Sequence, residues 1–142
     1  MCDLRIAIVD DDAEIREMLQ SIFDDWKTDT AFNGTMEIIE FDCVDSAYKY
    51  ITENVWSPHI CCVDYRFKKG NGLDLAKQIK GVLTDRVNIF LITAWKKMLN
   101  EEEIAPFAKI LDKTHYESVE NEIICELNEL NSVAMCMNYG RC

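Results

Sequence analysis

The chain has 142 residues, a length that suits one compact domain with a buried core. Hydrophobic residues make up 49% of the sequence and charged residues 29%, as in an ordinary globular protein. Fifteen Lys and Arg against 26 Asp and Glu give a formal net charge of -11, which disfavours direct binding to nucleic acid or to an anionic membrane surface.

Apolar runs of strand length alternate with helical patterns along the whole chain. The runs occur at Ile6–Val9, Met36–Phe41, Ile60–Val63, Ile89–Ile92 and Ala108–Leu111. The helical patterns occur at Ile15–Trp26, Val44–Ile51, Leu75–Leu83, Lys97–Ile104 and Val119–Leu130, the fourth being weak and stopped by Pro106. Strands without polar alternation are typical of a sheet covered on both faces. The order predicts five parallel strands between two layers of helices, a three-layer α/β sandwich.

Two segments lack a regular pattern. We expect Lys27–Gly34 to be a long loop with its turn at Asn33-Gly34. After Leu130 the helical pattern fades, so the sequence predicts a domain over residues 1–131 and a loosely ordered tail over residues 132–142.

The seven cysteines are odd in number and irregular in spacing, and no signal peptide or membrane-spanning stretch accompanies them. We therefore expect reduced thiols in a cytoplasmic protein. Adjacent Cys61 and Cys62 are expected to point to opposite faces of one strand rather than to bind zinc.

Polar side chains follow four of the five predicted strands. They are Asp10 and Asp11 after the first, Asp64 after the third, Thr93 after the fourth, and Asp112 and Lys113 after the fifth. The carboxyl ends of parallel strands meet at one edge of a sheet, where ligands of such folds bind. The sequence therefore predicts a polar crevice there.

The residue types in this crevice suit magnesium and phosphate chemistry. Carboxylates that lie close together raise one another's pKa, and Mg²⁺ relieves that repulsion. Thr93 and Lys113 offer a hydroxyl and a cation to an anion beside the metal. A carboxylate next to Mg²⁺ also serves as a nucleophile for a phosphoryl group, and Asp64 is the candidate.

Simpler interpretations remain open at single positions. Asp11 and Glu14 have the spacing of a helix-capping pair, and Asp12 is itself a good N-cap residue. Lys113 has Asp112 and Glu117 as alternative ion-pair partners at the surface.

The ordered motifs IAIVDDDAEIREML, SPHICCVDYRFKKGNGLDLAKQI, NIFLITA and AKILDK resemble the receiver domain of two-component response regulators over residues 4 to 131. The resemblance implies a flavodoxin-like fold with strand order 2-1-3-4-5. It implies that Asp64 accepts a phosphoryl group from a phosphohistidine on a sensor histidine kinase or phosphotransfer protein, and that a downstream protein partner responds. Mg²⁺ is then held by Asp10, Asp11, Asp64 and the backbone carbonyl of Arg66, while Thr93 and Lys113 contact the phosphoryl oxygens.

Several positions depart from the receiver pattern. Arg66 and Trp95 occupy the positions that tune hydrolysis of the acyl phosphate in this family, and their bulk predicts slow autodephosphorylation. Thr114 replaces the usual proline after Lys113, so we expect no cis peptide there. Ile110 replaces the usual switching aromatic residue, and the segment 96–105 is short for a fourth helix.

Three functions remain in competition. The first is a phosphorylatable receiver of a two-component or phosphorelay system, either stand-alone or cut from a longer protein. The second is a degenerate receiver that acts as a protein-interaction module without phosphorylation. The third is a Mg²⁺-dependent aspartyl phosphatase similar to the haloacid dehalogenase family, which is disfavoured because Arg66 stands where that family has a second aspartate.

Overall fold

The computed structural model describes residues 3–67, 70–83 and 87–138, with side chains described as far as residue 132. Five strands form one sheet: β1 Asp3–Val9, β2 Thr35–Phe41, β3 Ile60–Asp64, β4 Asn88–Thr93 and β5 Lys109–Asp112. All neighbouring strands are parallel, in the order β2-β1-β3-β4-β5. The predicted fold class and strand order are therefore confirmed.

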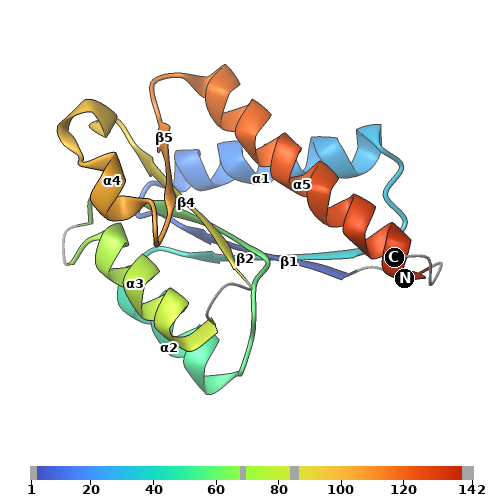
Figure 1. Ribbon diagram of the computed structural model, residues 1–142, viewed down its shortest axis with the longest axis horizontal. Coiled ribbons are helices and arrows are strands. Elements are labelled where there is room, and N and C mark those ends of the chain that lie inside the picture. The colour runs from blue at the N-terminus through green and yellow to red at the C-terminus, as the bar shows by residue number, and fades with distance from the viewer. Residues whose placement is uncertain (1–2, 68–69, 84–86, 139–142) are drawn as a thin grey trace.

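Helices cover both faces of the sheet. Their bounds are α1 Ala13–Asp29, α2 Val44–Glu53, α3 Gly72–Leu83, α4 Glu101–Ile104 and α5 Tyr116–Asn138, with a 3-10 turn, η2, at Lys96–Met98. Figure 1 shows α1 and α5 on one side and α2, α3 and α4 on the other. The three-layer arrangement places every crossover helix against the sheet, as parallel strands require.

Side chains along each strand point alternately to the two faces of the sheet, and this divides the interior into two hydrophobic cores. In β1, Ile6 and Ile8 pack under α1 and α5, whereas Ala7 and Val9 pack on the opposite face. Cys62 and Cys61 follow the same rule in β3, as predicted, so the two thiols lie in different cores. The four cysteines whose side chains the structure describes, Cys43, Cys61, Cys62 and Cys125, are free.

The connection between α1 and β2 corrects the predicted loop. Helix α1 continues to Asp29, so the predicted loop loses its first three residues to the helix and spans residues 30–34. The chain reverses at Thr30 and Ala31, with Ala31 at a φ of 51°, rather than at Asn33-Gly34. The periodic pattern underestimates α1 because its last turn, after the buried Trp26, is exposed and polar.

The connection between β4 and β5 is short, as expected. It holds only η2 and the single turn of α4. Asn100 is the N-cap of α4 and its side chain accepts hydrogen bonds from the peptide N–H groups of Glu102 and Glu103. Ile104 is buried and anchors this turn to the core.

Helix α5 continues past residue 131 to Asn138, so its end does not coincide with the predicted start of the tail. Residues 139–142 of that tail lie outside the described residues, as do Lys68 and Lys69. The described chain contains no cis peptide bond, and the bond between Lys113 and Thr114 is trans, as predicted. None of the helices that the structure describes has the length and hydrophobicity of a membrane-spanning segment.

Candidate functional site

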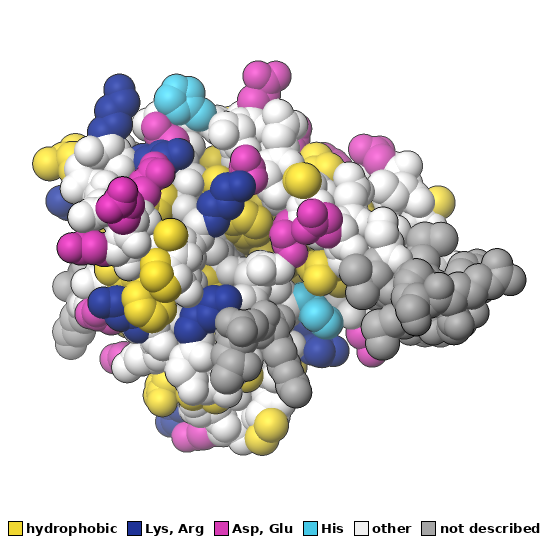
Figure 2. Space-filling model, in the orientation of Figure 1, with side chains coloured by type: hydrophobic (Ala, Val, Ile, Leu, Met, Phe, Trp, Pro, Cys, Tyr) yellow, Lys and Arg dark blue, Asp and Glu magenta, His cyan; other side chains and the backbone are white. Residues whose placement is uncertain are grey.

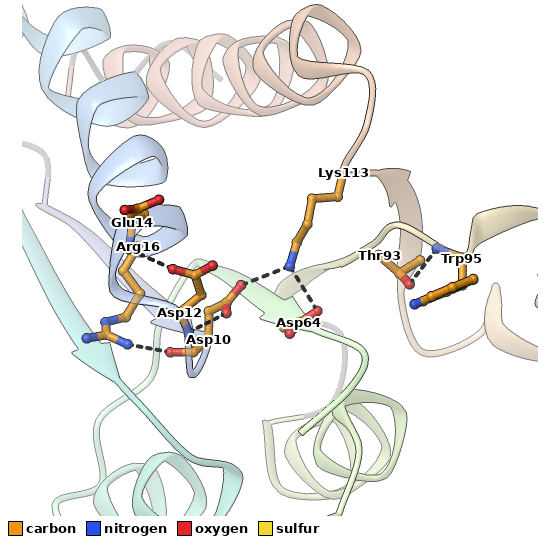
Figure 3. A network of polar contacts seen from close by, with 8 residues as sticks. All are labelled: Asp10, Asp12, Glu14, Arg16, Asp64, Thr93, Trp95 and Lys113. Carbon is orange, nitrogen blue, oxygen red and sulfur yellow. Dashed lines mark hydrogen bonds and ion pairs between the residues drawn. The ribbon is translucent and has the colours of Figure 1, made fainter. Parts of the chain in front are cut away.

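Four adjacent strands deliver the predicted polar residues to one edge of the sheet. Asp10 directly follows β1, Asp64 ends β3 and Thr93 ends β4, while Lys113 follows β5. Because β1, β3, β4 and β5 are neighbours in the sheet, their carboxyl ends lie side by side. Figure 3 shows Asp10, Asp64 and Lys113 converging on one point at this edge.

The three consecutive aspartates have different roles in the local structure. Asp10 is 2% exposed, and its Oδ1 accepts the peptide N–H of Asp12 at 2.9 Å. Asp12 is the N-cap of α1, and its Oδ1 accepts the peptide N–H of Glu14 at 2.9 Å. The capping interpretation therefore holds for Asp12. Asp11 is exposed and lies with Asp10 in a carboxylate cluster.

That cluster consists of Asp10, Asp11 and Asp64, each of which offers a carboxylate oxygen within 4.8 Å of the others. It is the one group of three or more acidic, His or Cys ligands found in the described part of the chain. Cys61 and Cys62 lie in different cores and so do not face one common site, and burial raises the pKa of the Cys61 thiol to about 12 and also raises that of Cys62. The donor set is all oxygen, which suits Mg²⁺.

Lys113 bridges two members of the cluster. Its Nζ lies 3.3 Å from Asp64 Oδ1 and 3.5 Å from Asp10 Oδ2. The lysine therefore points into the crevice instead of pairing with Asp112 beside it. Its side chain is 23% exposed, so the charge faces the crevice and remains accessible to a ligand.

The carboxylates are held in an environment that disfavours their charge. Burial is the largest cause that raises the pKa of Asp10 to about 6; the charge of Asp64 adds to it, and Lys113 opposes it. The pKa of Asp64 is also raised, first by burial and then by the charge of Asp11, against the effect of Lys113. One lysine does not compensate three carboxylates, and a bound cation would lower both pKa values.

Thr93 lies at the same edge but belongs to a different local network. Its side chain is buried, and Oγ1 accepts the peptide N–H of Trp95 at 3.0 Å. Figure 3 shows this bond on the far side of Asp64 from Asp10. A hydroxyl that accepts one hydrogen bond still has its own O–H to donate, so Thr93 can serve an anion bound at Asp64.

Arg66 and Trp95 meet beside the acidic cluster. The guanidinium carbon of Arg66 lies 4.9 Å from the centre of the Trp95 ring, a cation–π contact. Both side chains are exposed, with Trp95 at 46%. Because Arg66 follows Asp64 by two residues and Trp95 follows Thr93 by two, the pair joins the loops after β3 and β4 next to Asp64.

Gly72 permits the backbone to close around Asp64. A Cβ atom at Gly72 would collide with the carbonyl oxygen of Asp64 and lie 2.9 Å from side-chain atoms of Val63 and Leu91. The Gly72 N–H also donates to the carbonyl of Tyr65 at 2.8 Å. A glycine is therefore required for this approach between the start of α3 and the end of β3.

Arg16 was not among the predicted site residues, but it contacts one of them. Its Nη1 donates to the carbonyl oxygen of Asp10 at 2.6 Å and its Nε pairs with Glu40 Oε1 at 3.2 Å, which ties α1 to the ends of β1 and β2. The sequence offered one signal for this contact: Arg16 is the only basic residue in the first turns of a helix that is otherwise rich in acidic residues. Figure 3 shows Arg16 reaching Asp10 from the side opposite Lys113.

Comparison with known proteins agrees with this geometry. The family model of the response regulator receiver domain matches residues 6–114. A search of curated protein sequences found no match. Solved structures with the same fold include a receiver domain protein from Clostridium thermocellum, with a TM-score of 0.71 and 15% identity over 94% of this chain and 98% of that chain.

Two structures from Thermotoga maritima are also similar. The response regulator TrrA, in complex with Mg(2+)-BeF, has a TM-score of 0.68 and 19% identity over 87% of this chain and 98% of that chain. The response regulator domain of CheB has a TM-score of 0.67 and 18% identity over 92% of this chain and 98% of that chain. At these identities the likeness concerns the fold.

Proposed function

Because the chain belongs to the response regulator receiver domain family, we propose that it receives a phosphoryl group on Asp64 in a Mg²⁺-dependent reaction. The donor is a phosphohistidine on a sensor histidine kinase or phosphotransfer protein, and the product changes contacts with a downstream protein. The observation that carries the proposal is the convergence of Asp10, Asp11, Asp64 and Lys113 at the carboxyl edge of the sheet.

The residues present fit a magnesium ion. Three carboxylates share a small space, and burial raises the pKa values of Asp10 and Asp64, so the site favours a divalent cation over three free charges. Asp10, Asp11, Asp64 and the backbone carbonyl of Arg66 would hold it. When bound, Mg²⁺ supplies charge neutralisation for the carboxylates and for phosphoryl oxygens. The solved structure of TrrA with Mg(2+)-BeF supports this assignment.

In the proposed reaction, ionised Asp64 attacks phosphorus with a carboxylate oxygen. A P–O bond forms to Asp64 as the P–N bond to the donor imidazole breaks, and the electron pair of that bond returns to the imidazole nitrogen. Lys113, already 3.3 Å from Asp64, is positioned to exchange that contact for a phosphoryl oxygen, and the Thr93 hydroxyl donates to another. The chain thus acts as a signalling phosphoacceptor and catalyses only its own modification and its reversal.

The Arg66–Trp95 contact supports slow loss of the phosphoryl group. The stacked pair joins the loops on either side of Asp64, and the water that hydrolyses an acyl phosphate must approach between such loops. We propose that the pair restricts this approach. A phosphorylated lifetime of only seconds in Mg²⁺ would contradict the assignment.

The partners in this proposal are proteins. The net charge of -11 opposes nucleic acid, and on the face in Figure 2 acidic and basic side chains are interspersed among the described residues without a broad basic surface. A cytoplasmic location would place the chain with its kinase or phosphotransfer protein.

Phosphorylation in vitro tests the proposal directly. The protein is incubated with Mg²⁺ and acetyl phosphate, and intact mass spectrometry counts the phosphoryl groups added. We expect one group on the wild-type chain and on Asp24→Ala, which removes an exposed carboxylate of α1, and none on Asp64→Ala. An unmodified wild-type chain would favour the degenerate receiver, and a modified Asp64→Ala would refute the assignment of Asp64.

A further inference from the structure

The turn after β5 is closed by the side chain of Asp112. Its Oδ1 accepts two hydrogen bonds from Thr114, one from the peptide N–H at 2.9 Å and one from the hydroxyl at 2.6 Å. Its Oδ2 lies 3.1 Å from His115 Nδ1, and its peptide carbonyl accepts the N–H of His115 at 3.0 Å. Asp112, which precedes Lys113, is therefore hydrogen-bonded to the two residues that follow Lys113, namely Thr114 and His115.

This turn fixes the backbone from which Lys113 extends. The Lys113 N–H donates to the carbonyl of Thr93 at 2.8 Å, which attaches it to β4. On the other side, the carbonyl of His115 accepts the N–H of Val119 at 3.1 Å, so the turn leads directly into α5. A lysine side chain has many rotamers, and its Nζ reaches a defined point only when its backbone is held.

The Asp112 carboxylate is suited to this role because it is charged. Hydrogen bonds from the Thr114 hydroxyl and peptide N–H lower its pKa, with a smaller effect from His115. An ionised acceptor makes shorter and stronger hydrogen bonds than a neutral one. Thr114, unlike proline, leaves the backbone torsion φ free, so the restraint on this turn comes from hydrogen bonds rather than from a ring.

We propose that Asp112 is a positioning residue that holds Lys113 Nζ between Asp10 and Asp64 by closing the turn through Thr114 and His115. The proposal rests on the proposed phosphoacceptor function, because Lys113 acts there on a phosphoryl oxygen. Asp112 itself has no contact with the carboxylate cluster within the described contacts, so it acts through Lys113.

The rate of phosphorylation by acetyl phosphate in Mg²⁺ measures the effect. We expect Asp112→Ala to be slower than wild type by about tenfold or more, because a misplacement of about 1 Å in a reacting group costs up to ~100-fold. Asp112→Asn keeps an oxygen that accepts both Thr114 bonds, more weakly because the amide is neutral, and should recover part of the rate. Asp24→Ala removes the same charge from an exposed position and should match wild type.

A double variant separates positioning from general damage. If Asp112 acts through Lys113, adding Asp112→Ala to Lys113→Ala should slow the reaction by less than about twofold. The Mg²⁺ affinity of Asp112→Ala, measured by calorimetry, should stay within about twofold of wild type, because the metal-binding carboxylates keep their places. If Asp112→Ala proves unfolded in urea titrations, Thr114→Val takes its place, since it removes only the hydroxyl bond, and the same non-additivity is expected.

Three results would overturn the inference. A wild-type rate in Asp112→Ala, an equal slowing with and without Lys113, or an Asp112→Asn as slow as Asp112→Ala would show that the turn does not position the lysine. If wild type accepts a phosphoryl group and Asp112→Ala accepts it equally fast, only this inference fails. If wild type accepts none, the proposed function fails together with it.

Discussion

Magnesium binding should weaken as the pH falls through the pKa of Asp10. Protons and the metal compete for the same carboxylate oxygens, and only the ionised form binds the cation. With a pKa of about 6, Asp10 is about 90% ionised at about pH 7 and about 10% ionised at about pH 5. The apparent affinity for Mg²⁺ should therefore fall about tenfold across this interval, and more where protonation of Asp64 contributes.

Calorimetric titration with MgCl₂ at a series of pH values measures this dependence. The Lys113→Met variant provides the internal control: Lys113 lowers the pKa of Asp10, so its removal should move the midpoint to higher pH. Asp12→Ala removes the neighbouring carboxylate, which caps α1, and should leave the midpoint unchanged. An affinity that changes less than about twofold between about pH 7 and about pH 5 would refute the assignment of the buried Asp10 as a ligand.

Three further predictions concern the surroundings of the site. Trp95→Ala removes the contact with Arg66 and should shorten the lifetime of the phosphorylated protein in mass spectrometry; an unchanged lifetime would exclude shielding by this pair. Gly72→Ala should lower the free energy of unfolding, measured in urea, by about 1–3 kcal/mol, because the new Cβ collides with the Asp64 carbonyl. Gly81→Ala in the same helix is the control: its Cβ meets open space, so the same free energy should rise by up to about 1 kcal/mol. Asp12→Ala should lower the same free energy by about 0.5–2 kcal/mol through loss of the α1 cap, yet still accept one phosphoryl group; loss of phosphorylation in a folded variant would place Asp12 in the site.

The pattern of apolar residues determined the fold. Five apolar runs separated by helical patterns leave few arrangements other than a covered parallel sheet, since each period is set by local backbone geometry. The pattern was less reliable where a helix surface is polar, which is why the last turn of α1 was predicted as loop. The extension of α5 to Asn138 was not predicted because the apolar residues after position 131 are consecutive and show no helical spacing.

The sequence also indicated which residues meet at the candidate site, because the ends of parallel strands share one edge. Asp10, Asp11 and Asp64 lie together, and Lys113 reaches two of them. The position of a residue at the end of a strand did not predict which neighbour its side chain contacts. Thr93 bonds to the Trp95 backbone rather than directly to the cluster.

Only the tertiary structure decided the contacts that join separate elements. Three contacts are of this kind. Arg16 donates a hydrogen bond to the Asp10 carbonyl, Arg66 stacks on Trp95, and Lys113 pairs with Asp64 rather than with Asp112. Each contact depends on side-chain positions to within a fraction of an ångström. Periodicity specifies the face and the edge on which a residue lies. Whether two such residues touch depends on strand register, loop course and rotamer, which the packing of the whole chain fixes together.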